Sequence, residues 1–236
     1  MCIVVNKGHI ITNHSIVLKI FYRFFYYQKC NILFDNTLFY INFFTRMQLI
    51  FSTHNQFKLV ELQQLLKDKV TLLSLSDLGV FEEIEETGKT LKDNALLKAK
   101  IIYDKYGKNV FADDTGLEIE ALNGAPGVLS ARFAGEEKNA TKNIEKVLKL
   151  LEDKKNRKAC FKTVIALILN GKDYFFEGTV EGQILYKPIG SRGFGYDPIF
   201  MPDGYEVSFA QMEPETKNRI SHRGKAVEKL IKFLNN

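Results

Sequence analysis

The 236-residue sequence has no tryptophan and only three cysteines, and charged residues interrupt its longest apolar stretch. Cys2, Cys30 and Cys160 form no CxxC pair and have no histidine at metal-ligand spacing, which argues against a disulfide framework or a zinc site. Within residues 16–44, charges such as Lys19 break the run before it reaches the roughly 18 to 20 residues of a membrane helix. No small-residue cleavage site follows. We therefore expect a cytoplasmic protein with no membrane partner.

Charge of one sign is also scarce once the N-terminal region is set aside. The formal net charge is +5, but residues 1–46 hold five basic side chains against one acidic, which leaves 28 basic and 27 acidic for residues 47–236. A nearly neutral domain has no electrostatic footprint for nucleic acid, although a focused site for a small anion fits.

Residues 1–46 also differ in composition, because they hold 11 of the 29 Phe and Tyr residues. One interpretation is an extension translated from an upstream start, with Met47 as the true initiator. The alternative is a real extension that docks its aromatic side chains on the domain or on a partner. We place the domain boundary between residues 46 and 47.

Beyond Met47, strand-like and helix-like segments alternate. Apolar spacing, capping residues and glycine stops predict strands in "MQLIFST" and "VTLLSL" and helices in "NQFKLVELQQLLKD", "TLKDNALLKAKIIYDKYG", "TKNIEKVLKLLEDK" and "SHRGKAVEKLIKFL". "NVFA" and "LEIEA" are expected to flank a turn at "DDTG". Asn170-Gly171 separates two β-rich runs, as in a two-residue hairpin. The fold class is therefore α/β with a mixed parallel and antiparallel sheet.

The stretch "STHNQFK", residues 52–58, brings a hydroxyl, an amide and an ammonium group to a helix start. Thr53, Asn55 and Lys58, with free backbone N–H groups at the positive end of the helix dipole, suit a phosphate. The glycines of a Walker loop are missing. Taken alone, the stretch favours the simpler alternative, in which Asn55 is an ordinary N-cap and Lys58 a surface residue.

Two adjacent carboxylates in "FADDTG" repel each other unless a cation or hydrogen-bond donors compensate them. Mg²⁺ is a natural compensator because it favours one or two carboxylates together with phosphate oxygens. If Asp113 and Asp114 continue a strand, they point to opposite faces, so that only one needs to bind metal. The alternative is a capped Asx-turn. In "EEIEETGKT", Glu85 or Glu86 supplies a second metal ligand or belongs to a solvated loop.

The stretch "GFGYDP", residues 193–198, combines glycines with ring faces. Phe194 and Tyr196 offer flat surfaces, Asp197 accepts hydrogen bonds, and Gly195 allows close approach of the backbone. Such a set suits a nucleobase pocket, or else a β-turn with core aromatics. Downstream, "KNRISHR" adds donors that read a purine carbonyl or lie on a helix surface, namely Lys217, His222 and Arg223.

Taken together, these stretches resemble the inosine/xanthosine triphosphate pyrophosphatases. "STHNQFKLVEL", "EETGKTLKDNALLKA", "FADDTGLEIEALNGAPGVLSARFAG", "GFGYDPIF" and "KNRISHRGKA" stand in that family's order and spacing, from Met47 to about Leu234. The resemblance implies an elongated mixed-sheet α/β fold, a homodimer, and Mg²⁺-dependent hydrolysis of ITP, dITP and XTP to the monophosphate and pyrophosphate.

The resemblance also implies roles for individual residues. Asp114 would be the catalytic carboxylate and a metal ligand, with Glu85 as the second ligand. Thr115 stands where the family usually has serine, and His54 where glycine is frequent. The substrate would be bound by Thr53, His54, Asn55, Gln56, Phe57, Lys58, Thr115, Phe194, Gly195, Tyr196, Asp197, Lys217, His222 and Arg223.

Two rival functions are a catalytically silent nucleotide sensor and a pyrimidine-directed pyrophosphatase. The presence of Asp114, Glu85 and Lys58 argues against the sensor, because nucleotide binding alone does not require an acidic metal pair. "GFGYDP" followed by "SHR" disfavours the second.

Overall fold

The computed structural model describes residues 31–34, 37–40, 46–66 and 69–235. The chain divides into two compact units, Met1–Arg46 and Met47–Asn236. In the first unit, β1 (Asn31–Phe34) pairs antiparallel with β2 (Thr37–Tyr40). Cys2, Cys30 and most of residues 16–44 lie outside the described residues, so the expectations made for them stay predictions.

The second unit is built on a seven-stranded mixed sheet in the order β4-β3-β5-β7-β8-β9, with β6 paired to β5. β3 (Gln48–Phe51) runs parallel to its neighbours β4 (Thr71–Ser74) and β5 (Val110–Ile119). The remaining pairings are antiparallel and involve β6 (Pro126–Gly127), β7 (Lys158–Leu169), β8 (Lys172–Ile184) and β9 (Phe200–Pro202). The predicted mixed α/β fold is confirmed.

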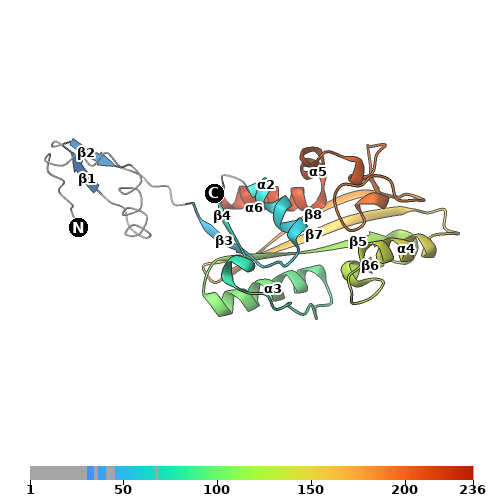
Figure 1. Ribbon diagram of the computed structural model, residues 1–236, viewed down its shortest axis with the longest axis horizontal. Helices are drawn as coiled ribbons and strands as arrows, with labels where there is room; N and C mark the ends of the chain where they lie inside the picture. The colour runs from blue at the N-terminus through green and yellow to red at the C-terminus, as the bar shows by residue number, and fades with distance from the viewer. Residues whose placement is uncertain (1–30, 35–36, 41–45, 67–68, 236) are drawn as a thin grey trace. The chain divides into compact units, whose positions relative to one another are not determined.

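Helices lie on both faces of this sheet (Figure 1). One face carries α3, and the other carries α2 and α6. The helices are α2 (Gln56–Leu66), α3 (Leu91–Tyr106), α4 (Ala140–Leu150), α5 (Pro214–Ile220) and α6 (His222–Leu234), with short 3-10 turns η1 (Ser76–Leu78), η2 (Glu120–Leu122), η3 (Ser130–Arg132), η4 (Asp197–Ile199) and η5 (Phe209–Gln211).

The helix ends follow from local capping chemistry. The hydroxyl of Thr90 accepts a hydrogen bond from the backbone N–H of Asp93 at the start of α3, and Gly107 ends that helix in the left-handed region. Asn55 caps α2 by accepting from the N–H of Lys58 at 3.1 Å. The predicted starts of α2 and α3 are therefore confirmed.

The Asn170-Gly171 hairpin is confirmed. Both residues have positive φ values, 51° and 79°, and Leu169 pairs with Lys172 across the turn. This is the geometry of a two-residue type I′ turn, which matches the twist of its strands. The long β7–β8 ribbon is the result.

The expected turn at "DDTG" is wrong. β5 passes through it without a break, and its pairing with β7 runs in register from Val110 opposite Ile168 to Ile119 opposite Ala159. The carboxylates of Asp113 and Asp114 are tolerated inside a buried strand because lysine and arginine side chains from other elements reach them. Buried strands do not require apolar residues at every position when such partners exist.

Within the described part of the chain, no helix is both long enough and apolar enough to cross a membrane.

Cys160 on β7 is a free thiol, and burial, with Glu181 nearby, raises its pKa to about 12. That thiol is therefore protonated and unreactive near neutral pH.

Candidate active site

A pocket of about 360 Å³ lies where the β3–α2 turn, β5, α3 and the two C-terminal helices meet. Its size falls in the range of small-molecule sites. Most of the predicted site residues line it, namely the catalytic and metal-binding candidate Asp114 and the substrate-binding candidates Thr53, His54, Asn55, Phe57, Lys58, Thr115, Phe194, Gly195, Tyr196, Asp197, Lys217, His222 and Arg223. Gln56 and Glu85 are exposed and do not line the pocket.

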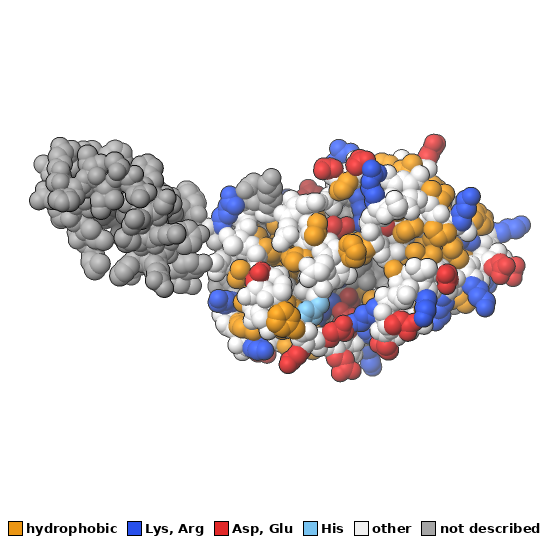
Figure 2. All heavy atoms as spheres, in the orientation of Figure 1, with side chains coloured by type: hydrophobic (Ala, Val, Ile, Leu, Met, Phe, Trp, Pro, Cys, Tyr) orange, Lys and Arg blue, Asp and Glu red, His pale blue; other side chains and the backbone are white. Residues whose placement is uncertain are grey.

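Acidic and basic side chains are interspersed over the face of the second unit that Figure 2 shows, with no single-sign field across it. A group of buried or half-buried charged side chains lines the pocket instead, among them Lys58, Lys98, Asp114 and Arg223. A focused site of this kind suits a small charged ligand better than a long polyanion.

One end of the pocket is built on the turn between β3 and α2. Lys58, on the first turn of α2, reaches inward and donates from Nζ to Asp113 Oδ1 at 3.0 Å. Thr53 accepts from the N–H of Asn55, and the amide of Asn55 caps the helix. The cap and the ammonium group therefore serve both structure and charge at this end.

Asp113 and Asp114 point to opposite faces of β5, as strand alternation predicts. Asp113 is fully buried between Lys58 and Arg223, and although burial opposes the shift, these cations lower the pKa of its carboxyl group. For Asp114, burial is the largest influence and raises the pKa. Asp113 thus acts as a fixed anion that holds two cations, whereas Asp114 is the better proton acceptor.

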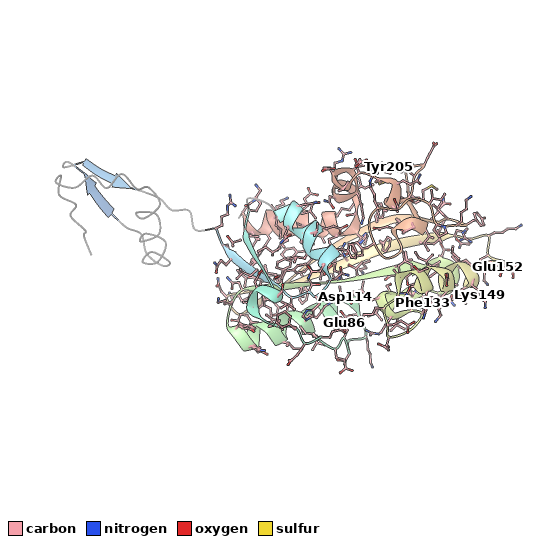
Figure 3. All side chains as sticks on the ribbon, viewed as in Figure 1. Glu86, Asp114, Phe133, Lys149, Glu152 and Tyr205 are labelled. Carbon is pink, nitrogen blue, oxygen red and sulfur yellow. The ribbon has the colours of Figure 1, made fainter. Side chains whose placement is uncertain are left out.

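Asp114 and Glu86, which are labelled close together in Figure 3, belong to a second cluster, in which Lys98 pairs with both carboxylates. Nζ of Lys98 lies 2.5 Å from Glu86 Oε1 and 3.5 Å from Asp114 Oδ1. Burial opposes ionisation of Lys98, but Asp114 and Glu86 outweigh it and raise its pKa. Glu86 lines the pocket, whereas Glu85 is exposed and does not.

The other end of the pocket is aromatic. Phe194 and Tyr196 come from the loop before η4, and Asp197 Oδ2 accepts from the N–H of Phe194 at 2.8 Å. A Cβ at Gly193 would collide with that carboxylate, and its φ of +72° also favours glycine. Gly193, the first glycine of "GFGYDP", is therefore needed for the loop to pack against Asp197.

A ladder of alternating charges joins the two ends. Arg223 donates from Nε to Asp113 at 3.1 Å and from Nη1 to Glu61 at 2.5 Å, and Nζ of Lys217 lies 2.7 Å from both Glu61 and Asp197. Lys217 and Arg223 are 5 % and 2 % exposed. These are buried, paired cations, so the alternative of a basic helix surface does not hold for them.

His222 is buried and stacks on Phe161, with 4.5 Å between ring centroids. Burial, followed by the neighbouring Arg223, lowers its pKa well below the usual value, so the ring is neutral. Its Nδ1 is the buried side-chain atom that has no hydrogen-bond partner among the described residues. A ligand atom in the pocket is a natural partner, because an unpaired buried nitrogen is costly.

Sequence reasoning missed several residues of this pocket region, among them Glu61, Lys98 and Arg132. Lys98 sits on the apolar face of α3 between Ala95 and Ala99, both fully buried, and a lysine at a core position of an amphipathic helix is the signal that was available. Arg132 donates from Nη2 to the backbone oxygen of Glu86 at 3.0 Å and helps hold that loop.

Residues 49–233 match the model of the Ham1 family. The chain is 53% identical over 190 residues to a dITP/XTP pyrophosphatase from Flavobacterium psychrophilum, an alignment covering 80% of this chain and 100% of that protein.

Two solved structures are also similar. A HAM1 protein from Coxiella burnetii has a TM-score of 0.74 and 40% identity, covering 80% of this chain and 98% of that one. A nucleoside-triphosphatase and dITP/XTP pyrophosphatase from Mycobacterium abscessus has a TM-score of 0.64 and 41% identity, covering 78% and 98%. The chain therefore belongs to the Ham1 family, which confirms the resemblance drawn from its five sequence stretches.

Proposed function

We propose that this protein hydrolyses the purine nucleoside triphosphates dITP, XTP and ITP to the monophosphate and pyrophosphate. The observation that carries the proposal is one pocket with a charged end, built by Lys58, Lys98 and Asp114, and an aromatic end, built by Phe194 and Tyr196. A triphosphate and a purine need these two environments side by side. The relatives named dITP/XTP pyrophosphatases support the same substrates.

The charged end fits Mg²⁺. Glu86 and Asp114 come from different segments, yet an oxygen of each lies within 3.5 Å of the same ammonium group, so their carboxylates surround one cation position. One or two carboxylates plus phosphate oxygens are what Mg²⁺ prefers. We therefore assign the second ligand to Glu86 rather than Glu85. When bound, Mg²⁺ would neutralise phosphate charge and stabilise the leaving pyrophosphate.

Asp114 is the catalytic carboxylate in this proposal. Its burial raises the pKa of the carboxyl group, which makes it a better acceptor for the proton of a water molecule directed at the α-phosphorus. The amide of Asn94 donates to Asp114 Oδ2 at 3.2 Å and fixes its orientation. Lys58 and Thr53, with the start of α2, bind the polyphosphate through charge and hydrogen bonds.

We infer that the base is selected by those N–H groups of Arg223 and Lys217 that are not already bonded to protein acceptors. The guanidinium of Arg223 has five N–H groups, three of them donating to Asp113, Glu61 and Thr115, and Lys217 has two of its three in use. The remaining donors suit the 6-oxo group of hypoxanthine and xanthine. The 6-amino group of adenine would face a donor and leave both unpaired.

The decisive experiment is pyrophosphate release from a panel of XTP, ITP, dUTP and GTP with Mg²⁺, using wild type and Asp114→Asn. We expect release from XTP and ITP above dUTP and GTP, and a loss of at least about 10²-fold in kcat for Asp114→Asn with substrate binding largely kept. Binding without turnover in the wild type would indicate the nucleotide sensor, and preference for dUTP the pyrimidine-directed group.

Two further assignments complete the proposal. We propose a homodimer, which the family resemblance implies, acting in the cytoplasm, which the sequence predicts from its interrupted apolar stretch and missing cleavage site. Light scattering of the purified protein tests the homodimer. A monomer mass at working concentration would contradict it.

A further inference from the structure

Lys98 lies in a place where two carboxylates converge. It comes from the buried face of α3, is 8 % exposed, and puts its ammonium group between Glu86 and Asp114. The hydroxyl of Ser52 donates to its backbone oxygen at 2.9 Å, which anchors the main chain. Any displacement of the ammonium group therefore uses the flexible four-carbon side chain.

The oxygens around Lys98 divide into two kinds. Each carboxylate has one oxygen directed at another side chain: Asp114 Oδ2 accepts a hydrogen bond from Asn94 at 3.2 Å, and Glu86 Oε2 forms an ion pair with Arg132 Nη1 at 3.6 Å. The other oxygen of each, Asp114 Oδ1 and Glu86 Oε1, faces Lys98. The ammonium group thus takes the two oxygens that a metal ion would use.

Charge counting leads to the same point. Along the pocket, ion pairs join five cations, namely Lys58, Lys98, Arg132, Lys217 and Arg223, with five carboxylates, namely Asp113, Asp114, Glu86, Glu61 and Asp197. A divalent cation added to this balanced set would lie beside the ammonium of Lys98 and be repelled by it. A triphosphate added alone would bring uncompensated negative charge, to which a pocket-lining lysine is attracted.

We propose that, in the nucleotide-free protein, Lys98 occupies the cation position between Glu86 and Asp114, and that an arriving triphosphate draws its ammonium group away and leaves Glu86 Oε1 and Asp114 Oδ1 to the metal. This inference rests on the proposed function. It makes Lys98 a device that couples the two ligands: the site holds metal weakly until polyphosphate is present. Lys98 then neutralises phosphate charge, so one side chain acts both before and after the nucleotide binds.

The test measures metal binding and polyphosphate binding separately, without turnover. Mn²⁺ affinity of the nucleotide-free protein is measured by electron paramagnetic resonance for wild type, Lys98→Met and Lys100→Met. Lys100, two residues along α3, has a half-exposed side chain paired with Asp173 and is the matched control. We expect Lys98→Met to bind Mn²⁺ at least about tenfold more tightly, because a repelling unit charge has gone. Lys100→Met should match wild type.

Binding of inorganic tripolyphosphate, followed by calorimetry in EDTA, is the second arm. Lys98→Met should weaken it about tenfold or more, since a cation facing the phosphates is lost. Unchanged or weaker Mn²⁺ binding in Lys98→Met would overturn the proposal and leave Lys98 as a group that only positions the carboxylates. Should Lys98→Met fail to fold, Lys98→Gln, which can still donate to Glu86, takes its place. Neither arm depends on which nucleotide is cleaved, so absence of XTP hydrolysis would contradict the proposed function and not this inference.

Discussion

Glu61 is the residue that connects the two proposed base-reading cations. Its carboxylate accepts from Lys217 at 2.7 Å and from Arg223 at 2.5 Å. Burial opposes its ionisation, but Arg223 and Lys217 outweigh burial and lower the pKa of Glu61. Glu61 therefore positions both cations without itself being assigned a contact with the substrate.

We expect Glu61→Gln to lower kcat/KM for XTP by about tenfold, the scale of one misdirected charge-assisted hydrogen bond. The amide keeps the shape but turns N–H donors toward cations, so Lys217 and Arg223 lose their common orientation and the ratio of ITP to ATP activity should fall. Steady-state kinetics with both nucleotides measure this. Glu177→Gln, which changes an exposed pair with Lys162, is the control.

Glu61 is a better position than Arg223 for testing this positioning role by mutation. Arg223→Ala would remove one of the two cations that pair with each of the buried carboxylates Asp113 and Glu61, a loss of up to about 3–5 kcal/mol in the free energy of unfolding. An unchanged ITP/ATP ratio in a folded Glu61→Gln protein would remove the positioning role. Retained tripolyphosphate binding would show that the effect is confined to the base end.

At the scale of elements, the close contact between α6 and β8 fixes the base end of the pocket. Gly178 on β8 has no room for a side chain, because a Cβ would collide with the backbone oxygen of His222 and lie 2.6 Å from the N–H nitrogen of Ala226. Both obstacles are main-chain atoms that cannot rotate away. The start of α6, which carries His222 and Arg223, is held at this distance from the sheet.

Gly178→Ala should therefore push α6 away from β8. We expect a loss of about 1–3 kcal/mol in the free energy of unfolding, as for overpacking, together with a lower kcat/KM for XTP because Arg223 moves with the helix. Urea unfolding and kinetics test both. Thr179→Ala, at an exposed neighbouring position, should change neither; a Gly178→Ala protein with wild-type stability and activity would show that α6 has room to adjust.

At the scale of the whole molecule, residues 1–46 and 47–236 form separate compact units, and the family match spans 49–233. The relative from Flavobacterium psychrophilum aligns over its full length with 80% of this chain. All residues assigned here to the pocket lie in the second unit. The interpretation of residues 1–46 as translated from an upstream start stays a prediction.

We expect a protein that begins at Met47 to fold and to keep the XTP activity of the full chain. Its midpoint of thermal unfolding should equal that of residues 1–236, and its kcat/KM should agree within about twofold, since no pocket residue is removed. If residues 1–46 packed on the domain, removing them would lower the stability of the domain clearly. Loss of solubility or of activity would favour the alternative, an extension whose aromatic side chains dock on the domain or on a partner.

The sequence alone determined the features that neighbouring residues control. Thr90, Gly107 and Asn170-Gly171 specify caps and a turn through their own backbone preferences, so the helix ends and the hairpin were predictable. The five stretches likewise carried the family, because a motif is a local string of side chains. Of the predicted pocket residues, only Gln56 and Glu85 do not line it.

Only the tertiary structure decided which charges meet. The hydrogen-bonded pairs lie far apart in the sequence: Lys58 and Asp113 are separated by 55 residues, Arg223 and Asp113 by 110, and Lys217 and Glu61 by 156. No local periodicity encodes such pairs, since they depend on the order of strands in the sheet and on which helix crosses which face. The same pairs let β5 continue through Asp113 and Asp114, where local propensity favours a turn. Burying a charge is tolerated only when a partner from elsewhere in the fold lies within reach, and that partner is set by three-dimensional packing.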